Sequence, residues 1–146
     1  MIRDLQDLWI LKEGGVVVFS KKNNKSINDQ FIGGFISALS SFTKVILNDI
    51  LSHFATHNLQ VKILSKEGFM FVGRFPKKVK DKQVKKELDY IVSKFFEYFP
   101  QDQINKFGTD MKYYQKFEEI LTHNYETLTD YISYIWNNKT NEYDYF

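Results

Sequence analysis

The histidines and a pair of glutamates are the side chains that could bind a metal or transfer protons. His53 and His57 are four residues apart, a spacing that suits metal chelation on a helix. They lie in or beside a predicted strand, where this spacing separates them by about 13 Å. Glu118 and Glu119 are adjacent, so on a helix they point about 100° apart and cannot act as a facing acid–base pair. His123 is isolated and is interpreted as a packing residue, so we predict no metal site.

The sequence also lacks the motifs of other classes of catalytic site. The chain has no cysteine, which excludes thiolate catalysis, disulfides and cysteine-ligated zinc and is compatible with a reducing, cytoplasmic location. A glycine-rich phosphate loop, a nucleophile elbow and an HExxH motif are also absent from the sequence. We therefore expect a protein that is not an enzyme and needs no cofactor.

Basic residues concentrate in the segment 61–86. It has nine basic and two acidic residues, a net charge of +7 in a chain whose total is +2. The densest part is formed by six lysines: Lys77, Lys78, Lys80, Lys82, Lys85 and Lys86. One interpretation is a solvated loop followed by the polar face of a helix; the other is a patch for an anionic membrane or an acidic partner. Residues 76–89 include no aromatic side chain for base stacking, so no nucleic acid partner is expected.

The elements that must position these residues begin with a hairpin at Gly14-Gly15. Strand-forming residues occupy 8–11 and 16–19, and the glycine pair supplies the positive φ angles of a tight turn. Further strands are predicted over 51–56, 59–64 and 69–75, and their short connections are typical of an antiparallel meander.

Three helices are predicted around these strands. Ser26 is the expected N-cap of the first, with Asp29 three residues later in a pattern close to a capping box. Apolar residues recur at helical spacing over 84–99, and Pro100 ends that second helix. A loop is expected over 101–108. A third helix, long or kinked, then follows a cap at Thr109 or Asp110.

This order of elements, β-β-α-β-β-β-α-α, predicts an α+β fold. A five-stranded antiparallel sheet with the first helix on one face and the other two on the opposite face would bury every apolar stripe. A chain of 146 residues fits one domain with a sizeable core. We assign residues 1–136 to that domain and 137–146 to a polar tail.

The first helix has more apolar surface than one contact with a sheet can cover. A broad face is predicted to lie on the sheet: Ile27, Phe31, Phe35, Ala38, Leu39, Phe42, Val45 and Ile46. The neighbouring flank and its strip of small side chains are predicted to bind a partner: Ile32, Gly33, Ile36, Ser37, Ser40 and Leu47. Glycine costs a helix about 1 kcal/mol relative to alanine, which favours a functional reason for Gly33-Gly34. The alternative is that loops cover the flank and the glycines only permit close approach to the sheet.

The element order, the opening hairpin and the first helix together resemble a longin domain. The hairpin reads LWILKEGGVVVFS over 8–20 and the helix FIGGFISALSSF over 31–42. Longin domains are SNARE-like modules related to roadblock domains, and the resemblance extends over about residues 5–136. It implies a non-catalytic platform that dimerises and binds small Ras-like GTPases or trafficking-complex subunits, often at a membrane surface. No heptad motif or membrane anchor follows the domain, so no role in fusion is expected.

Two classes of function follow. The first is a longin-type scaffold, cytoplasmic or peripheral to a membrane, whose partner is a small GTPase, another longin or roadblock subunit, or a second copy. The second is a ligand-binding sensor, because PAS-like and profilin-like folds share this sheet and its flanking helices. A sensor needs an internal pocket of about 300 Å³ or more, and it ranks second because bulky residues predict a filled core: Phe35, Phe42, Phe54, Phe69, Phe71 and Phe95. Polar residues interrupt the apolar run 30–43, so no membrane span is expected.

Overall fold

The first two strands form the predicted hairpin. In the computed structural model, which describes residues 2–12, 14–23, 25–123 and 128–138, β1 (Asp7–Lys12) pairs antiparallel with β2 (Val16–Lys22). Gly14 and Gly15 have φ angles of 89° and 85°, which glycine adopts without a steric penalty. Because Ile10 pairs with Phe19 and Leu11 with Val17, β2 has one extra residue and bulges at that point.

A five-stranded sheet follows from this hairpin and a meander. β3 (His53–Ala55), β4 (Leu59–Lys66) and β5 (Phe69–Pro76) complete it in the order β2-β1-β5-β4-β3. Every neighbouring pair of strands is antiparallel. The predicted fold class is confirmed, and the hairpin and the meander join where β1 pairs with β5.

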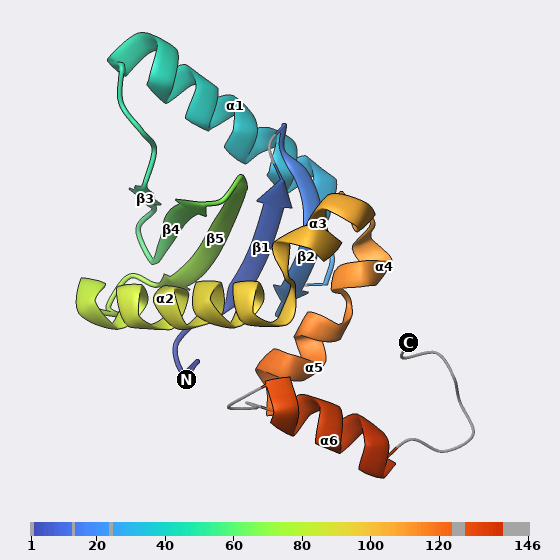
Figure 1. Cartoon of the computed structure of the whole chain (residues 1–146). Helices are drawn as coiled ribbons and strands as arrows, with labels where there is room; N and C mark the ends of the chain where they lie inside the picture. Colours follow the sequence, from blue (N-terminus) through green and yellow to red (C-terminus); the bar gives the residue numbers. More distant parts are fainter. Residues whose placement is uncertain (1, 13, 24, 124–127, 139–146) are drawn as a thin grey trace.

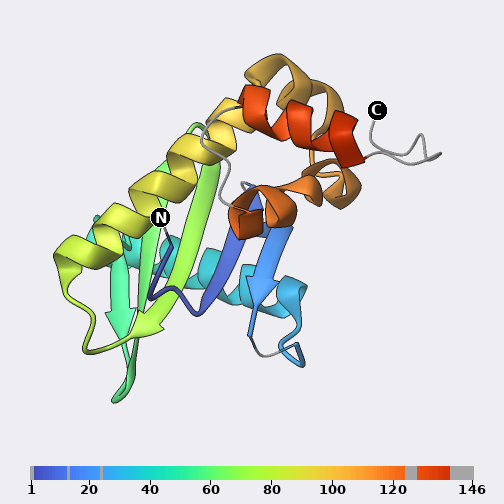
Figure 2. The ribbon, with the colours of Figure 1, turned by 90° about the horizontal axis from the view of Figure 1, so that it is seen from below.

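Helices cover both faces of the sheet. In β1, Leu8 and Ile10 belong to one apolar cluster, whereas Trp9 and Leu11 belong to a second, because successive side chains of a strand point to opposite faces. Figures 1 and 2 show α1 (Asp29–Leu47) on one face and α2 (Asp81–Tyr98) on the other. The larger cluster lies under α2 and contains the aromatic residues Phe69, Phe71 and Phe95.

α1 begins later than the sequence analysis predicted. Its N-cap is Asn28 and not the predicted Ser26. The side-chain oxygen of Asn28 accepts a hydrogen bond from the Phe31 backbone N–H at 3.0 Å. Asparagine is among the best N-cap residues because its short side chain satisfies an N–H that has no partner within the helix. The helix ends at Asn48, which has a left-handed φ of 50°.

The chain after α2 is more helical than predicted. The prediction of a loop over 101–108 is wrong, because these residues form α3 (Gln101–Phe107), in which Ile104 is fully buried. Pro100 ends α2 and precedes α3, since proline lacks an N–H that the first turn of a helix leaves unpaired in any case. The predicted long helix is divided into α4 (Met111–Tyr114), α5 (Lys116–His123) and α6 (Leu128–Asn138). Asp110, one of the two predicted caps, is the N-cap of α4. The rest of the predicted tail, 139–146, lies outside the described residues.

Candidate interaction surfaces

α1 packs on the sheet with the side that the sequence analysis assigned to a partner. Gly33 and Ile36 are buried, and Ile32, Ser37 and Ser40 are half-buried. The predicted orientation of the helix is therefore wrong, and these five residues face their own domain. Of the six predicted interface residues, only Leu47 is exposed, beyond the part of α1 that touches the sheet.

A close backbone contact between Gly33 and Gly15 sets this orientation. A Cβ atom on Gly33 would overlap the carbonyl oxygen of Gly15 and lie 3.0 Å from a methyl carbon of Val17. A Cβ atom on Gly15 would lie 2.7 Å from the Gly33 carbonyl oxygen. Both sides of α1 are apolar, so hydrophobicity alone does not choose between them. The requirement for close packing does, because only the side with Gly33 can approach the hairpin.

Polar side chains at the start of α1 fix the helix to β1 and β2. Asp29 accepts hydrogen bonds from the Trp9 indole N–H at 3.2 Å and from the Ser20 hydroxyl at 2.8 Å. Its carboxylate also forms an ion pair with Lys22, with an N–O distance of 2.9 Å. The N-terminal half of α1 is thus held by hydrogen bonds, an ion pair and the glycine contact.

Gln30 covers part of the free edge of β2. Its side-chain carbonyl accepts from the Val17 N–H and its side-chain N–H donates to the Val17 C=O, both at 3.2 Å. These are the bonds that an added strand would make, and an unprotected edge invites such pairing. The Gln30 amide therefore blocks strand addition at Val17.

An apolar stripe on the other side of α1 is exposed. We call it the outer face of α1, and it consists of Phe31, Phe35, Ala38, Phe42, Val45 and Ile46. The exposed fraction is 74% for Phe31, 57% for Phe42 and 78% for Val45. These residues were predicted to be covered by the sheet, and that prediction is wrong because all six are exposed. Phe35 keeps one contact with the sheet, with its ring centroid 6.3 Å from that of Phe54 on β3. Contiguous exposed apolar residues are typical of interaction surfaces, whereas single ones are common on any monomer.

Gly34 lies beside the outer face and has no packing role within the chain. It is exposed, and among the residues that the structure describes nothing lies within 4 Å of a Cβ atom placed on it. This differs from Gly33, its neighbour, whose missing side chain is required by the Gly15 contact. The helix therefore includes a destabilising glycine that its own domain does not need.

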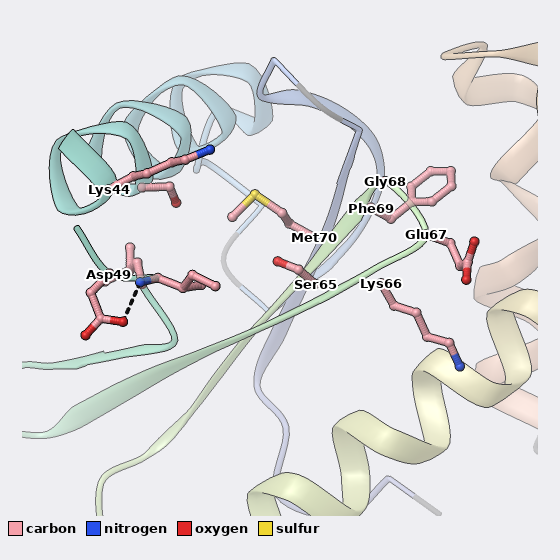
Figure 3. Close-up of a pocket in the computed structure, with 11 residues that line it drawn as sticks. Lys44, Asp49, Ser65, Lys66, Glu67, Gly68, Phe69 and Met70 are labelled. Carbon is pink, nitrogen blue, oxygen red and sulfur yellow. Dashed lines mark hydrogen bonds between the residues drawn. The ribbon is translucent and has the colours of Figure 1, made fainter.

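The C-terminal half of α1 stands away from the sheet and leaves a cleft. Figure 3 shows Lys44 on α1, Asp49 on the segment after it, and Ser65, Glu67 and Met70 around the β4–β5 turn. The cleft has a volume of about 430 Å³. Among the described residues, the Ser40 hydroxyl at this cleft has no hydrogen-bond partner although the atom is buried. Contact with the sheet is thus concentrated in the first half of α1.

α1 also has the length and apolar composition of a membrane-spanning helix, the one such helix among the described residues. Nevertheless Gly33 and Ile36 pack against the sheet, and the helix starts with a half-buried polar network around Asp29. We therefore interpret α1 as a helix of the folded domain that is apolar on two sides.

The six lysines of the predicted basic patch divide into two groups of three. Lys77, Lys78 and Lys80 lie on the β5–α2 connection and line a cavity of about 410 Å³ together with His53 and Asp81. Lys82, Lys85 and Lys86 lie in the first turns of α2, outside that lining, and Lys85 pairs with Asp89 at 2.6 Å. In the described part of the chain, no carboxylate lies within 4.0 Å of the other five lysines.

The candidate metal and acid–base residues do not gather into a site. His53 is exposed and approaches the Gln60 side-chain oxygen at 3.3 Å, and His57 is exposed in the β3–β4 turn. Within the described ranges, no three histidine or carboxylate side chains are placed to share a metal ion.

Comparisons with known proteins agree with this architecture. Two solved structures share the fold at low identity. The gliding protein MglB from Thermus thermophilus is 11% identical, with a TM-score of 0.50, and the match covers 59% of this chain and 71% of MglB. A Roadblock/LC7 domain from Streptomyces avermitilis is 9% identical, with a TM-score of 0.51, and the match covers 63% of this chain and 82% of that domain. No curated protein matches the sequence. The family model described as the first longin domain of FUZ, MON1 and HPS1 matches residues 6–135, and the chain belongs to this longin family.

Proposed function

We propose that this protein is a non-catalytic longin-type scaffold that pairs with a second longin-type domain through the outer face of α1. A second copy of the same chain is such a domain and is the partner that can be tested directly. The pair acts in the cytoplasm or at the surface of a membrane, where it binds a small Ras-like GTPase, as the longin and roadblock resemblance implies. The exposed apolar outer face is the observation that supports pairing.

The composition of the outer face suits a symmetric contact. None of its six residues is charged, so two copies can meet without placing like charges against each other. Phe31, Phe35 and Phe42 supply the large aromatic surface that dominates the energy of protein interfaces.

Gly34 supports a helix-to-helix contact in particular. With Ala38 and Ser41 it forms a strip of small side chains beside the aromatic residues, and small side chains let two backbones come close. In the described part of the chain nothing lies within 4 Å of a Cβ atom placed on Gly34, and the cost of this glycine to the helix is offset if a second helix packs over it.

A sensor function, the alternative from the sequence, has less support. Phe69, Phe71 and Phe95, which were expected to fill the core, are fully buried between the sheet and α2. Phe35 and Phe42 were also expected there and are instead exposed. The cleft in Figure 3 opens at the surface beneath α1 and is not enclosed by the sheet and α2.

Size-exclusion chromatography with light scattering tests the pairing. Interfaces of standard size have dissociation constants of about 1 µM or tighter, so the protein should be a dimer at about 100 µM. Val45→Lys, in the outer face, should give a folded monomer, because it places a charge in an apolar contact. Ile132→Lys on α6 is the matched control, since Ile132 is also exposed, and it should leave the dimer intact. A wild-type monomer at this concentration, or equal effects of both changes, would contradict the pairing.

A further inference from the structure

We propose that the cavity between β3 and the start of α2 binds a phosphate group, either as free inorganic phosphate or as the phosphomonoester of a soluble sugar or inositol phosphate or of a phosphorylated lipid headgroup. The cavity is open to solvent, has a volume of about 410 Å³ and is lined by Lys77, Lys78 and Lys80, with His53 on β3. This site is separate from the outer face of α1, since α1 and α2 cover opposite faces of the sheet (Figure 1).

The lysines lie on a connection that is held in place. Gln60 is 4% exposed, and its side-chain N–H group donates to the carbonyl oxygens of Pro76 and Val79 at 3.1 and 2.8 Å. The Lys77 N–H donates to the Asn58 carbonyl at 2.9 Å. These bonds turn backbone carbonyls of the connection toward Gln60 and fix the positions from which the lysines extend. Because this backbone is already ordered, anion binding costs only the ordering of the exposed lysine side chains.

The charges at the cavity are poorly compensated by the protein. Three lysines face one carboxylate, that of Asp81, and among the described residues no ion pair within 4.0 Å forms between them. Like charges that are held together repel one another, and a bound anion would relieve that repulsion. Phosphate is favoured over a carboxylate because it has a higher charge and more acceptor oxygens for several ammonium groups at once.

The start of α2 adds donors at the same place. α2 has eighteen residues, and its N-cap is Lys80, whose side chain forms no capping hydrogen bond. Serine, threonine, aspartate or asparagine normally satisfies the first N–H groups of a helix, and lysine cannot accept a hydrogen bond. The Gln83 N–H already donates to the Lys80 carbonyl at 2.9 Å, so the donors that remain in the first turn are the N–H groups of Asp81 and Lys82. With the positive end of the helix dipole, they add to the attraction of the lysines.

The two groups of lysines allow a matched test. Lys77→Gln/Lys78→Gln/Lys80→Gln and Lys82→Gln/Lys85→Gln/Lys86→Gln each remove three charges from neighbouring, exposed positions, but only the first group lines the cavity. Binding of inorganic phosphate and of a soluble inositol phosphate is measured by NMR shifts of His53 and of the 77–81 backbone amides. Binding to vesicles is measured with phosphatidylcholine alone, with phosphatidylserine, and with a phosphatidylinositol phosphate at equal surface charge.

The expected result is that the cavity triple variant loses at least about tenfold in affinity for the phosphorylated ligand, whereas the helix triple variant changes by less than about threefold. Stronger binding to the phosphatidylinositol phosphate vesicles than to the soluble inositol phosphate identifies a lipid headgroup as the ligand. Equal binding of the vesicles and the soluble compound identifies a free phosphate ligand. Both outcomes support the site. Equal losses in the two variants, binding that depends only on vesicle charge, or binding of an acidic peptide without any phosphate ligand would overturn it. An unchanged melting temperature and oligomeric state confirm that the variants are folded, and they separate this result from the pairing through α1.

Discussion

At the scale of the residue, two adjacent glycines in α1 have opposite surroundings. Gly33 is buried against Gly15, and a Cβ atom there would overlap a carbonyl oxygen, whereas Gly34 is exposed with free space around it. The first glycine is required by packing within the chain, and the second is not.

This contrast predicts opposite effects of the same substitution. Gly34→Ala should raise the free energy of unfolding of the monomer by about 1 kcal/mol, because alanine is the better helix former. Gly33→Ala should lower it by about 2 kcal/mol or more, since the helix must move away from the hairpin. Urea denaturation at low protein concentration measures both changes, and equal effects of the two would show that the contact with Gly15 is not made.

Tyr114 is a second residue with an informative environment. Its side chain is buried, and its hydroxyl donates to the Gly108 carbonyl oxygen at 2.9 Å. Burial, and secondly the nearby Tyr113, raises the pKa of Tyr114 to about 12 from an ordinary value of 10.0. The folded state therefore favours the neutral phenol.

The sign of the alkaline response follows from this shift. The contribution of Tyr114 to stability is complete below about pH 10, where the phenol is neutral in both states, and is lost as the pH rises toward 12. Burial lowers the pKa of Lys116, and this shift raises the stability of the fold as the pH rises. The comparison with Tyr114→Phe therefore isolates the contribution of the tyrosine. That variant should be less stable at pH 7 by about 1 kcal/mol and should lose less stability between pH 9 and 12 in thermal denaturation. A parallel loss in the two proteins would contradict this assignment.

At the scale of the element, α1 and the edge strand β2 are coupled through Gln30. The amide of Gln30 occupies both backbone groups of Val17 on the open side of β2. The surfaces available to a partner differ accordingly: the strand edge is protected at this position, and the outer face of α1 is not.

Gln30→Ala should therefore open the edge of β2. Exchange of the Val17 amide hydrogen should become faster, because its hydrogen-bond partner is lost, while the overall stability falls by about 1 kcal/mol. Hydrogen exchange followed by NMR measures this, with the amide of Trp9 as the internal control, because β1 lies between β2 and β5. An unchanged rate at Val17 would mean that Gln30 does not protect the edge.

At the scale of the whole molecule, an uncharged surface and a basic cavity lie on different sides of one sheet. The outer face of α1 is apolar and carries no charge, whereas the cavity at the start of α2 has three lysines against one aspartate. The two surfaces should respond differently to ionic strength.

Raising the salt concentration from about 0.1 to 1 M shortens the screening length from about 10 to 3 Å. Phosphate binding at the cavity should weaken by at least about tenfold over this range, whereas the dimer should persist or tighten. Light scattering and ligand titration at several salt concentrations measure both. A dimer that dissociates in salt would show that charged groups, and not the outer face of α1, hold it together.

The sequence determined the fold because its signals were local. The hairpin follows from Gly14-Gly15 between two strand-forming stretches, α2 from its apolar spacing, and the antiparallel order from short connections. The cap of α4 is predicted to be Thr109 or Asp110, and the structure has Asp110, because capping depends on residues within a few positions. The sequence does not predict α3, because Pro100 marks the end of one helix and is equally compatible with the start of the next.

Only the tertiary structure decided which side of α1 meets the sheet. Both sides are apolar, so the hydrophobic pattern predicted the wrong one, and the choice came from a contact between residues 15 and 33 that no local pattern encodes. The same holds for the basic run: the sequence presented six similar lysines, and the fold placed three of them with His53 around one cavity. Burial of Gln60 and its bonds to the β5–α2 connection likewise depend on the pairing of β4 with β5. Local patterns specify elements, whereas steric fit between elements specifies which surfaces remain for partners.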